Sequence, residues 1–435
     1  MFPMAHETGL QIREFQERDI SGTSIQEMTD ARRLLRCPCT GSKKGFRSET
    51  AGTLFYEGEE PEAMMQACPH IMAPGSLPYT RQAGEDRDDS NRGKAGTGTM
   101  NEIDQYMRAC RLCPRDCGAD RLSGACGACG VPAEVYVARA ALHAWEEPCI
   151  SGNNGSGAVF FTGCGLKCVF CQNGAISGTA VPKRLAETDA QKCRVAVPGK
   201  PVTVSRLAAV FLRLQNEQHA NNINLVTAVQ YIPQAAQALR IAKAQGLRIP
   251  VVYNSSGYEK AASLRLLEGL VDIWLPDFKY MDSELAAAYS HAPDYPDIAK
   301  RAIAEMVRQA GEPAFYEETR WGKDGEPMPA GSGARLMKRG VIVRHLLLPG
   351  HVKNAKAVVQ YLHDTYGNSI YISMMNQYTP MRNTFEDSLL SRKVTKREYE
   401  RLTDYAVWIG VENGFIQEGG TAEESFIPSW NGEGV

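Results

Sequence analysis

Three cysteines stand close together in the run Gly163-Cys-Gly-Leu-Lys-Cys-Val-Phe-Cys-Gln-Asn173. Cys164, Cys168 and Cys171 follow the spacing C-x3-C-x2-C. Thiolates are the usual ligands of iron-sulfur clusters, and closely spaced cysteines in one loop can wrap a single cubane. Three thiolates leave one iron of a 4Fe-4S cluster open, as a site that binds a substrate or cofactor requires. The alternatives are a zinc site with a distant fourth ligand, or three buried thiols.

A second group of cysteines lies upstream of this run. Cys110 with Cys113 and Cys126 with Cys129 form two C-x2-C pairs separated by twelve residues, close to the spacing of zinc knuckles. Cys117 is surplus to a four-ligand zinc site, which makes a second iron-sulfur cluster an equal alternative. We therefore expect the two pairs to hold zinc or a second cluster, with structural thiols as the third interpretation.

A parallel α/β fold is expected to position these residues. Short apolar runs alternate with amphipathic helical patterns, which is typical of parallel strands joined by crossover helices. The strands are expected at 158–162, 223–227, 249–253, 271–275, 341–348 and 370–374. The helices are expected at 204–219, 233–245, 258–269, 294–310, 351–366 and 396–411. Six such units predict a partial (β/α)6 barrel of TIM type rather than a full barrel of eight.

The chain is expected to have three parts. Residues 1–105 are polar and glycine-rich toward their end, which predicts a disordered extension or a translation start near Met100 or Met107. Residues 106–150 form a small cysteine-rich metal-binding module, and 151–435 form the barrel. Two long stretches, 181–201 and 318–339, are expected to be surface insertions.

Composition restricts the compartment and the partners. The net charge of -2 and the pI near 6.5 give no sign of a nucleic-acid partner. The sequence has no apolar run of about 18 residues and no apolar leader at its start, so we expect no membrane association. Ten of the 13 cysteines lie between Cys110 and Cys193, which indicates metal binding in a reducing, cytoplasmic setting more than disulfides.

Several further motifs occur in order along the chain. They are Glu146-Glu147-Pro148, Gly155-Ser-Gly157, Asn222–Thr227, Val252–Glu259, Leu275–Tyr280, Arg344–Gly350 and Gln377-Tyr378. Together with the cysteine run they resemble the family homologous to pyruvate formate-lyase activating enzymes, within the radical S-adenosylmethionine superfamily. The similarity covers roughly Tyr106 to Trp430 and predicts the barrel form of that superfamily.

The resemblance implies a radical enzyme. S-adenosylmethionine would chelate the open iron, and an electron from the reduced 4Fe-4S cluster would cleave it to a 5′-deoxyadenosyl radical that abstracts hydrogen from a substrate. The implied partners are a reductant protein such as flavodoxin or ferredoxin, and a glycyl-radical enzyme as substrate. The alternatives are a radical maturase or small-molecule enzyme, or a non-catalytic protein that binds zinc or an iron-sulfur cluster.

Residues that follow the first and the third strand are candidates for cofactor binding. Phe170 resembles the aromatic residue that the superfamily places beside the adenine, with loop packing as the alternative. Asn254, Ser255 and Ser256 follow the third strand, where amide and hydroxyl groups suit the ribose or the methionine moiety. A helix N-cap is the alternative role of the two serines.

Charged residues at the later strands are further candidates. Asp277 and Lys279 project to one side if the chain stays extended, and they resemble the Asp-Leu-Lys element of activating enzymes. Lys279 suits the carboxylate of the cofactor, with a surface ion pair as the alternative. Arg344 and His345 interrupt an apolar strand, so one of them must face inward. We expect Arg344 to face the cofactor, with a strand-end salt bridge as the alternative.

The remaining expectations concern single positions. Gln377 and Tyr378 follow the sixth strand and are expected to line the adenine pocket or the substrate mouth. The family usually shows Thr-Pro-Thr-His after the second strand, whereas this chain has Thr227-Ala-Val-Gln230, so no substrate role transfers to that loop. Cys149 is expected to be structural and Cys193 incidental.

Overall fold

The computed structural model describes residues 13–14, 100–178, 198–319, 334–381, 384, 386–417 and 428–435. The chain divides into two units, Met1–Arg36 with Gly98–Val435, and Cys37–Thr97, and the second unit lies outside the described residues. Most of the extension expected over 1–105, and Cys193, also lie outside them. Those expectations stay predictions.

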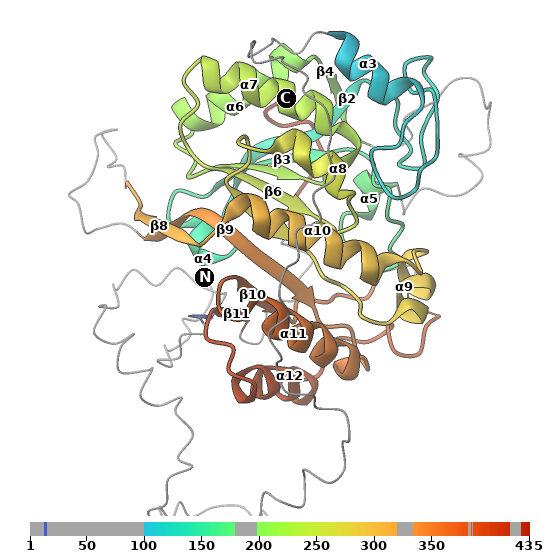
Figure 1. The fold of residues 1–435 in the computed structure, drawn as a ribbon, viewed down its shortest axis with the longest axis vertical. Coiled ribbons are helices and arrows are strands. Elements are labelled where there is room, and N and C mark those ends of the chain that lie inside the picture. The colour runs from blue at the N-terminus through green and yellow to red at the C-terminus, as the bar shows by residue number, and fades with distance from the viewer. Residues whose placement is uncertain are drawn as a thin grey trace, which may run out of the picture. The chain divides into compact units, whose positions relative to one another are not determined.

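Parallel strands form the middle of one sheet (Figure 1). In spatial order they are β11 (Gly414–Ile416), β10 (Tyr371–Met375), β9 (Arg335–Leu346), β7 (Ile273–Pro276), β6 (Val251–Ser255), β5 (Ile223–Val226) and β3 (Ser156–Phe161). All six predicted strands are confirmed, as β3, β5, β6, β7, β9 and β10. Strands β3, β5 and β7 are buried along their whole length, which explains their continuous apolar runs.

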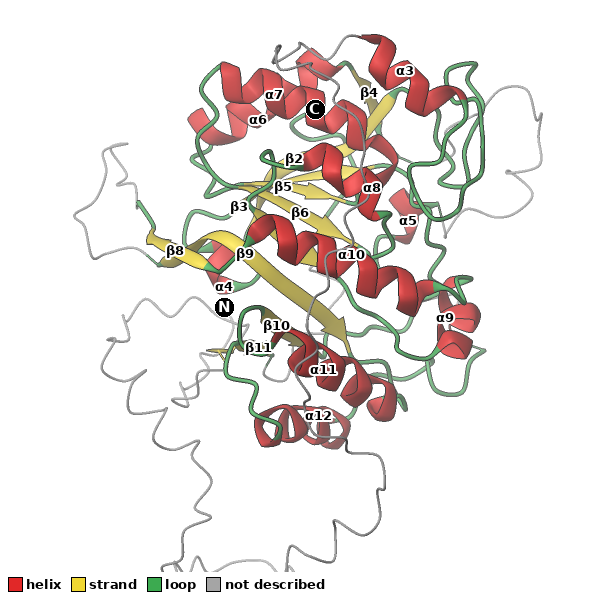
Figure 2. Ribbon diagram, in the orientation of Figure 1, coloured by secondary structure: helices red, strands yellow, loops and turns green. Residues whose placement is uncertain are grey.

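Long helices cover the parallel strands. They are α6 (Val204–Asn216), α7 (Ile232–Ala244), α10 (Tyr295–Ala310), α11 (Val352–Tyr366) and α12 (Lys396–Trp408). Helix α10 packs on β7 and β9, and α11 packs on β9 (Figure 2). Among the described residues no helix is long and apolar enough to cross a membrane.

Strands that the sequence analysis did not predict extend the sheet at both ends. Strand β2 (Val135–His143) lies between β3 and β4 (Lys200–Val202) and is antiparallel to both, while β1 (Arg13–Glu14) pairs with β11. The two outermost strands of the sheet, β1 and β4, do not pair with each other in the part of the chain that the structure describes. The sheet is therefore an open partial barrel.

Two predicted segments have other structures. Strand β8 (Ala314–Glu317) pairs antiparallel with the first half of β9, so β9 begins at Arg335 and part of the expected insertion 318–339 belongs to the sheet. The expected helix 258–269 is replaced by α8 (Ala261–Leu264) and a 3-10 turn (Arg265–Leu267), because the backbone of Lys260 is extended and the helix begins only after it. The other short helices are α3 (Met100–Arg108), α4 (Pro148–Ser151), α5 (Gly174–Ser177) and α9 (Ser283–Ser290).

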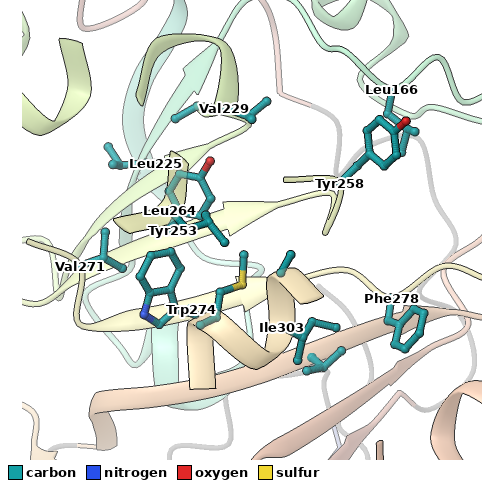
Figure 3. Packing of buried hydrophobic residues seen from close by; sticks show 14 of the residues in the cluster. Leu166, Leu225, Val229, Tyr253, Tyr258, Leu264, Val271, Trp274, Phe278 and Ile303 are labelled. Carbon is teal, nitrogen blue, oxygen red and sulfur yellow. The ribbon is translucent and has the colours of Figure 1, made fainter. Parts of the chain in front are cut away.

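The core lies between the sheet and its covering helices. Figure 3 shows Trp274 of β7 beside Tyr253 of β6, with Leu264 of α8 and Ile303 of α10 packed nearby. The Trp274 and Tyr253 rings are 5.5 Å apart between centroids, and both are fully buried. Burial of such large rings is the main stabilising contribution to this layer.

A buried tyrosine joins the ends of two strands. The hydroxyl of Tyr295 lies 2.8 Å from the carbonyl oxygen of Ser256 and 3.0 Å from that of Asp277, and it accepts a hydrogen bond from the backbone N–H of Lys279. Gly257 crosses this junction with φ 74°, and a Cβ there would overlap the carbonyl oxygen of Asp277. The junction therefore fixes the chain on which the predicted cofactor residues lie.

We expect Gly257→Ala to be much more destabilising than Gly269→Ala. Both glycines have positive φ, but a Cβ at Gly269 would meet nothing within 4 Å. Positive φ alone costs about 1–2 kcal/mol for alanine, and the overlap at Gly257 adds about 1–3 kcal/mol. Urea unfolding of both variants measures the difference, and equal losses would show that the junction is not constrained as described.

Candidate functional site

The three cysteines of the cluster run line one cavity at the carboxyl ends of the parallel strands. Cys164, Cys168 and Cys171 lie between β3 and α5. The same cavity is lined by Val226 of β5, Asn254 of β6, Asp277 after β7, Arg344 of β9 and Met375 of β10. In barrel proteins this is the edge where the loops carry chemistry. The structure thus places the predicted ligands where strand-end groups converge.

A glycine directs the chain into the cysteine loop. Gly163 has φ 89°, and a Cβ there would stand 2.8 Å from both the Cys129 carbonyl oxygen and Val131 Cγ1. Its N–H donates to the Ile176 carbonyl oxygen at 2.8 Å. Any side chain at this position would push the loop away from the upstream cysteine module, so the loop requires glycine before Cys164.

The buried thiols are protonated before they bind a metal. Burial raises the pKa of Cys164 to about 12 and that of Cys168 to about 11. Lys279 opposes the rise at Cys168, and Ser290 Oγ donates a hydrogen bond to Cys168 Sγ at 3.0 Å. Metal binding as thiolates therefore releases protons.

The arrangement fits a cluster better than a single ion. A zinc ion with four thiolates at about 2.3 Å requires sulfurs roughly 3.8 Å apart. Within the described ranges no group of three or more His, Cys, Asp or Glu side chains is positioned to hold one metal ion. A 4Fe-4S cluster takes its thiolates on separate iron atoms, so three thiols that line one cavity suit it.

Lys279 and Asp277 form an ion pair in the cavity wall. Lys279 Nζ lies 2.5 Å from Asp277 Oδ2, and the two side chains are 15% and 24% exposed. Burial alone would lower the pKa of Lys279, but attraction by Asp277 and then by Cys168 outweighs burial and raises it. Lys279 is therefore a fixed positive charge facing the cysteine loop.

The residues after β6 also face the cavity. Asn254, Ser255 and Ser256 all line it. Ser255 Oγ donates to Glu259 Oε2 at 3.1 Å. The N-cap alternative for the serines is wrong, because α8 is preceded by Lys260 and has no side-chain cap.

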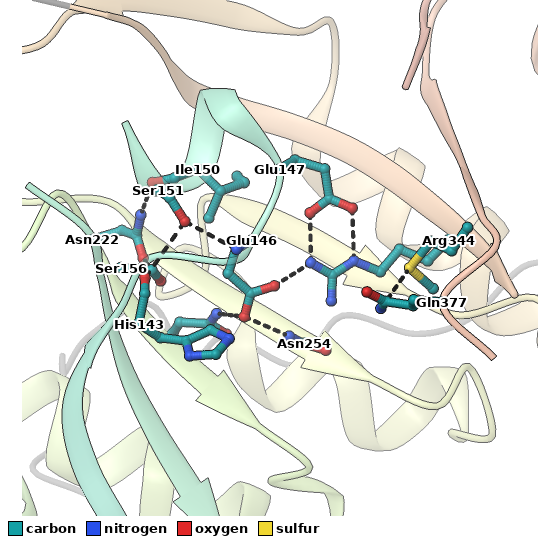
Figure 4. A network of polar contacts seen from close by, with 12 residues as sticks. His143, Glu146, Glu147, Ile150, Ser151, Ser156, Asn222, Asn254, Arg344 and Gln377 are labelled. Atoms are coloured by element: carbon teal, nitrogen blue, oxygen red, sulfur yellow. Dashed lines mark hydrogen bonds and ion pairs between the residues drawn. The ribbon is translucent and has the colours of Figure 1, made fainter. Parts of the chain in front are cut away.

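A buried charge network closes one end of the cavity (Figure 4). Arg344 Nε donates to Glu147 Oε1 at 2.8 Å, and its Nη2 lies 2.5 Å from Glu147 Oε2 and also contacts Glu146. Glu146 Oε1 accepts from Asn224 Nδ2 at 2.8 Å and from Asn254 Nδ2 at 3.4 Å. Arg344 thus lines the cavity, as expected, and also makes the salt bridge given as the alternative.

The neighbour of Arg344 faces the opposite side of β9. His345 is buried, and its Nδ1 lies 2.7 Å from the carbonyl oxygen of Phe278. Burial lowers the pKa of His345 to about 4, so it is neutral at pH 7. The strand alternation predicted for this pair is confirmed.

Of the predicted residues Phe170, Gln377 and Tyr378, two line the cavity and one lies in the core. Phe170 and Gln377 line the cavity. Tyr378 does not line it, because it packs behind Phe170 with ring centroids 6.3 Å apart and donates to the Leu390 carbonyl oxygen at 2.6 Å. The expectation that Tyr378 lines a pocket is therefore wrong.

Sequence reasoning did not assign a role to the two consecutive glutamates. A buried arginine in an apolar strand requires carboxylate partners, and Glu146 and Glu147 were the candidates to consider.

The loop Thr227-Ala-Val-Gln230, where the family usually has Thr-Pro-Thr-His, has a structural role. Gln230 Nε2 donates to the carbonyl oxygens of Thr162 (3.0 Å), Gly163 (2.9 Å) and Thr227 (2.8 Å). Gln230 supports the cysteine loop from behind.

The upstream cysteines differ from the expected pairs in one member. Cys126 is not among the free thiols of the described residues. Cys110, Cys113, Cys117 and Cys129 carry free thiols. The expected ligand set with Cys126 stays a prediction, and the structure adds Cys117 as the fourth free thiol of this module.

Comparison with known proteins gives distant similarities. No family model matches this chain. An uncharacterized protein of Methanocaldococcus jannaschii is 26% identical over 301 residues, which are 69% of this chain and 75% of that protein. Among solved structures, SuiB of Streptococcus suis bound to S-adenosylmethionine has 13% identity and a TM-score of 0.34, over 59% of this chain and 48% of its own. Methylornithine synthase PylB has 11% identity and a TM-score of 0.35, over 60% of this chain and 72% of its own. The match thus spans about half the length of SuiB.

We expect Arg344→Met to destabilise the protein by about 3–5 kcal/mol at pH 7, because it leaves buried carboxylates unpaired. In the wild type, burial alone would raise the pKa of Glu146, but Arg344 outweighs burial and lowers it. Without Arg344, burial is the largest remaining influence and only His143 and Asn224 oppose it, so acidification toward pH 5 protonates Glu146 and the deficit relative to wild type shrinks.

Arg392→Met is the matched control. Arg392 pairs with Glu398 at 2.8 Å but is 39% exposed, so its loss costs about 1 kcal/mol or less. Unfolding free energies measured between pH 5 and pH 8 check both variants. A deficit for Arg344→Met that stays constant with pH would contradict the role given to Glu146.

Proposed function

We propose that this chain is a radical S-adenosylmethionine enzyme whose Cys164, Cys168 and Cys171 hold a 4Fe-4S cluster. The observation that carries the proposal is the position of all three thiols in one cavity with Lys279 and Asn254. Three thiolate ligands leave one iron open for the amino and carboxylate groups of S-adenosylmethionine. When bound and reduced, the cluster supplies the electron that cleaves the sulfonium of this cofactor to a 5′-deoxyadenosyl radical.

Polar residues of the cavity suit the cofactor's polar groups. Lys279 has three N–H donors and uses one on Asp277, so it can also bind the carboxylate of S-adenosylmethionine. Asn254 and Ser256 present amide and hydroxyl groups to the ribose or the methionine moiety. Phe170 supplies a flat apolar surface for the adenine.

Apolar residues form much of the remaining wall. They are Phe160, Phe161, Leu166, Ile176, Val226, Leu346 and Met375. Such a wall excludes water from the reacting groups, which protects a radical from side reactions.

The finer proposal concerns the partners. The motif resemblance supports a glycyl-radical enzyme as the substrate, and the need for a single low-potential electron supports a flavodoxin or ferredoxin as the reductant. The reduced thiols that the cluster requires suit a reducing compartment such as the cytoplasm.

Anaerobic reconstitution with iron and sulfide tests the central proposal. We expect the reduced protein to convert S-adenosylmethionine to methionine and 5′-deoxyadenosine. We expect Cys164→Ala, Cys168→Ala and Cys171→Ala each to lower the rate at least about 100-fold, because loss of a ligand exceeds the roughly 10–100-fold cost of losing an outer-shell partner. Chromatographic measurement of 5′-deoxyadenosine is the readout.

Cys149→Ala serves as the control, because Cys149 is a buried cysteine of α4 that does not line the cavity. It should keep the wild-type rate within about two-fold, since it only removes a small buried group. Undiminished cleavage by any of the three cluster-run variants would refute the ligand assignment.

A further inference from the structure

Four thiols next to the cysteine loop have no role in the proposed reaction. Cys110 and Cys129 are buried, Cys113 is half-buried, and Cys117 is exposed. The sulfurs of Cys117 and Cys129 lie 3.3 Å and 3.4 Å from the point where a Cβ would stand at Gly127. Cys117 Sγ also lies 3.8 Å from the Cys110 carbonyl oxygen. The four side chains therefore share one small region.

A buried arginine indicates that this region carries negative charge. Arg121 is 1% exposed and donates to the carbonyl oxygens of Gln230 (2.7 Å), Pro132 (2.7 Å) and Val131 (3.2 Å). Its Nη1 also lies 3.7 Å from Cys110 Sγ. The guanidinium also lies over the ring of Tyr231, 5.5 Å from its centroid, but no carboxylate among the described residues accepts a hydrogen bond from Arg121.

A guanidinium is always charged, and an isolated charge inside a protein is strongly destabilising unless an opposite charge compensates it. Neutral thiols cannot compensate Arg121, whereas thiolates bound to a metal centre carry the required negative charge. Arg121 therefore favours a metallated site over four structural thiols.

We propose that Cys110, Cys113, Cys117 and Cys129 hold a second iron-sulfur cluster of the 4Fe-4S type. This proposal goes beyond the proposed function and does not depend on it. Four thiolates occupy every iron of such a cluster, so it has no open iron for S-adenosylmethionine. Among the described residues no three such side chains are placed around one metal ion, which favours a cubane, where each thiolate binds a separate iron, over a single zinc ion.

The second site is in direct contact with the first cysteine loop. The backbone N–H of Cys164 donates to the Cys129 carbonyl oxygen at 3.2 Å. Cys113 Sγ lies 3.3 Å from the Cβ position of Gly165, and Arg115 Nε donates to the Gly165 carbonyl oxygen at 2.8 Å. Metal at the upstream site would therefore help to order the loop that carries Cys164.

Metal analysis of the full chain tests the proposal. Cys117 and Cys126 give a matched pair of variants, because Cys117 is a proposed ligand and Cys126 is not. After anaerobic reconstitution we expect about eight iron atoms per chain in the wild type, about four in Cys117→Ala and about eight in Cys126→Ala, at four irons per cubane. Elemental analysis for iron, sulfide and zinc is the readout, with circular dichroism to check folding. Cys113→Ala, which should also fall to about four irons, is used if Cys117→Ala does not fold.

The triple variant Cys164→Ala, Cys168→Ala and Cys171→Ala separates this proposal from the proposed function. It should lose S-adenosylmethionine cleavage and keep about four iron atoms, with the electron paramagnetic resonance signal of one reduced cluster. A wild type with one zinc that Cys117→Ala loses would overturn the cluster assignment. Loss of iron in Cys126→Ala but not in Cys117→Ala would overturn the ligand set, and an iron-free triple variant would overturn the second site itself.

Discussion

The pairing of Arg344 with Glu146 and Glu147 is the interaction on which the cavity depends. Arg344 belongs to β9, whereas the two glutamates lie between β2 and α4, almost 200 residues earlier in the chain. An arginine this deeply buried is tolerated only with carboxylates beside it. The pairing therefore joins the early and late strands of an open barrel around one cavity. Asn224 and Asn254 then extend the network to β5 and β6.

Arg121 shows the same constraint in the cysteine-rich module. It contacts carbonyl oxygens of its own module and that of Gln230, whose side chain supports the cysteine loop through Gly163. Arg344 is neutralised by carboxylates that the chain itself provides, whereas Arg121 has carbonyl oxygens, a thiol and the face of the Tyr231 ring, none of which carries a full negative charge. This contrast between two buried arginines is the reason for assigning an anionic metal centre to the module.

The sequence predicts the parallel strands well, because each is a short apolar run followed by a helical pattern. It does not predict β2 or β8, since these antiparallel strands have mixed burial and lack the continuous apolar runs of the parallel strands. Side-chain direction was predictable at Arg344 and His345, where strand alternation fixes it. It was not predictable at Tyr378, which follows the end of β10, where alternation no longer applies.

Ligand choice in the cysteine-rich module shows a further limit. The two C-x2-C pairs favoured Cys126, whereas the free thiols of the module include Cys117 instead, and spacing alone does not decide between the two. The contacts of Gln230 could not be predicted either, because its three carbonyl partners come from different segments. By contrast, the convergence of the three cluster-run cysteines with strand-end polar residues follows directly from the parallel topology.

The binding of S-adenosylmethionine to an open iron at the Cys164 loop is the central claim. Electron-nuclear double resonance on the reduced protein, with the amino nitrogen of S-adenosylmethionine labelled with nitrogen-15, tests it most directly. The account predicts a nitrogen-15 coupling to the cluster in the wild type and in Cys117→Ala, and none in Cys168→Ala. A wild-type cluster that shows no coupling to the labelled cofactor would contradict the account.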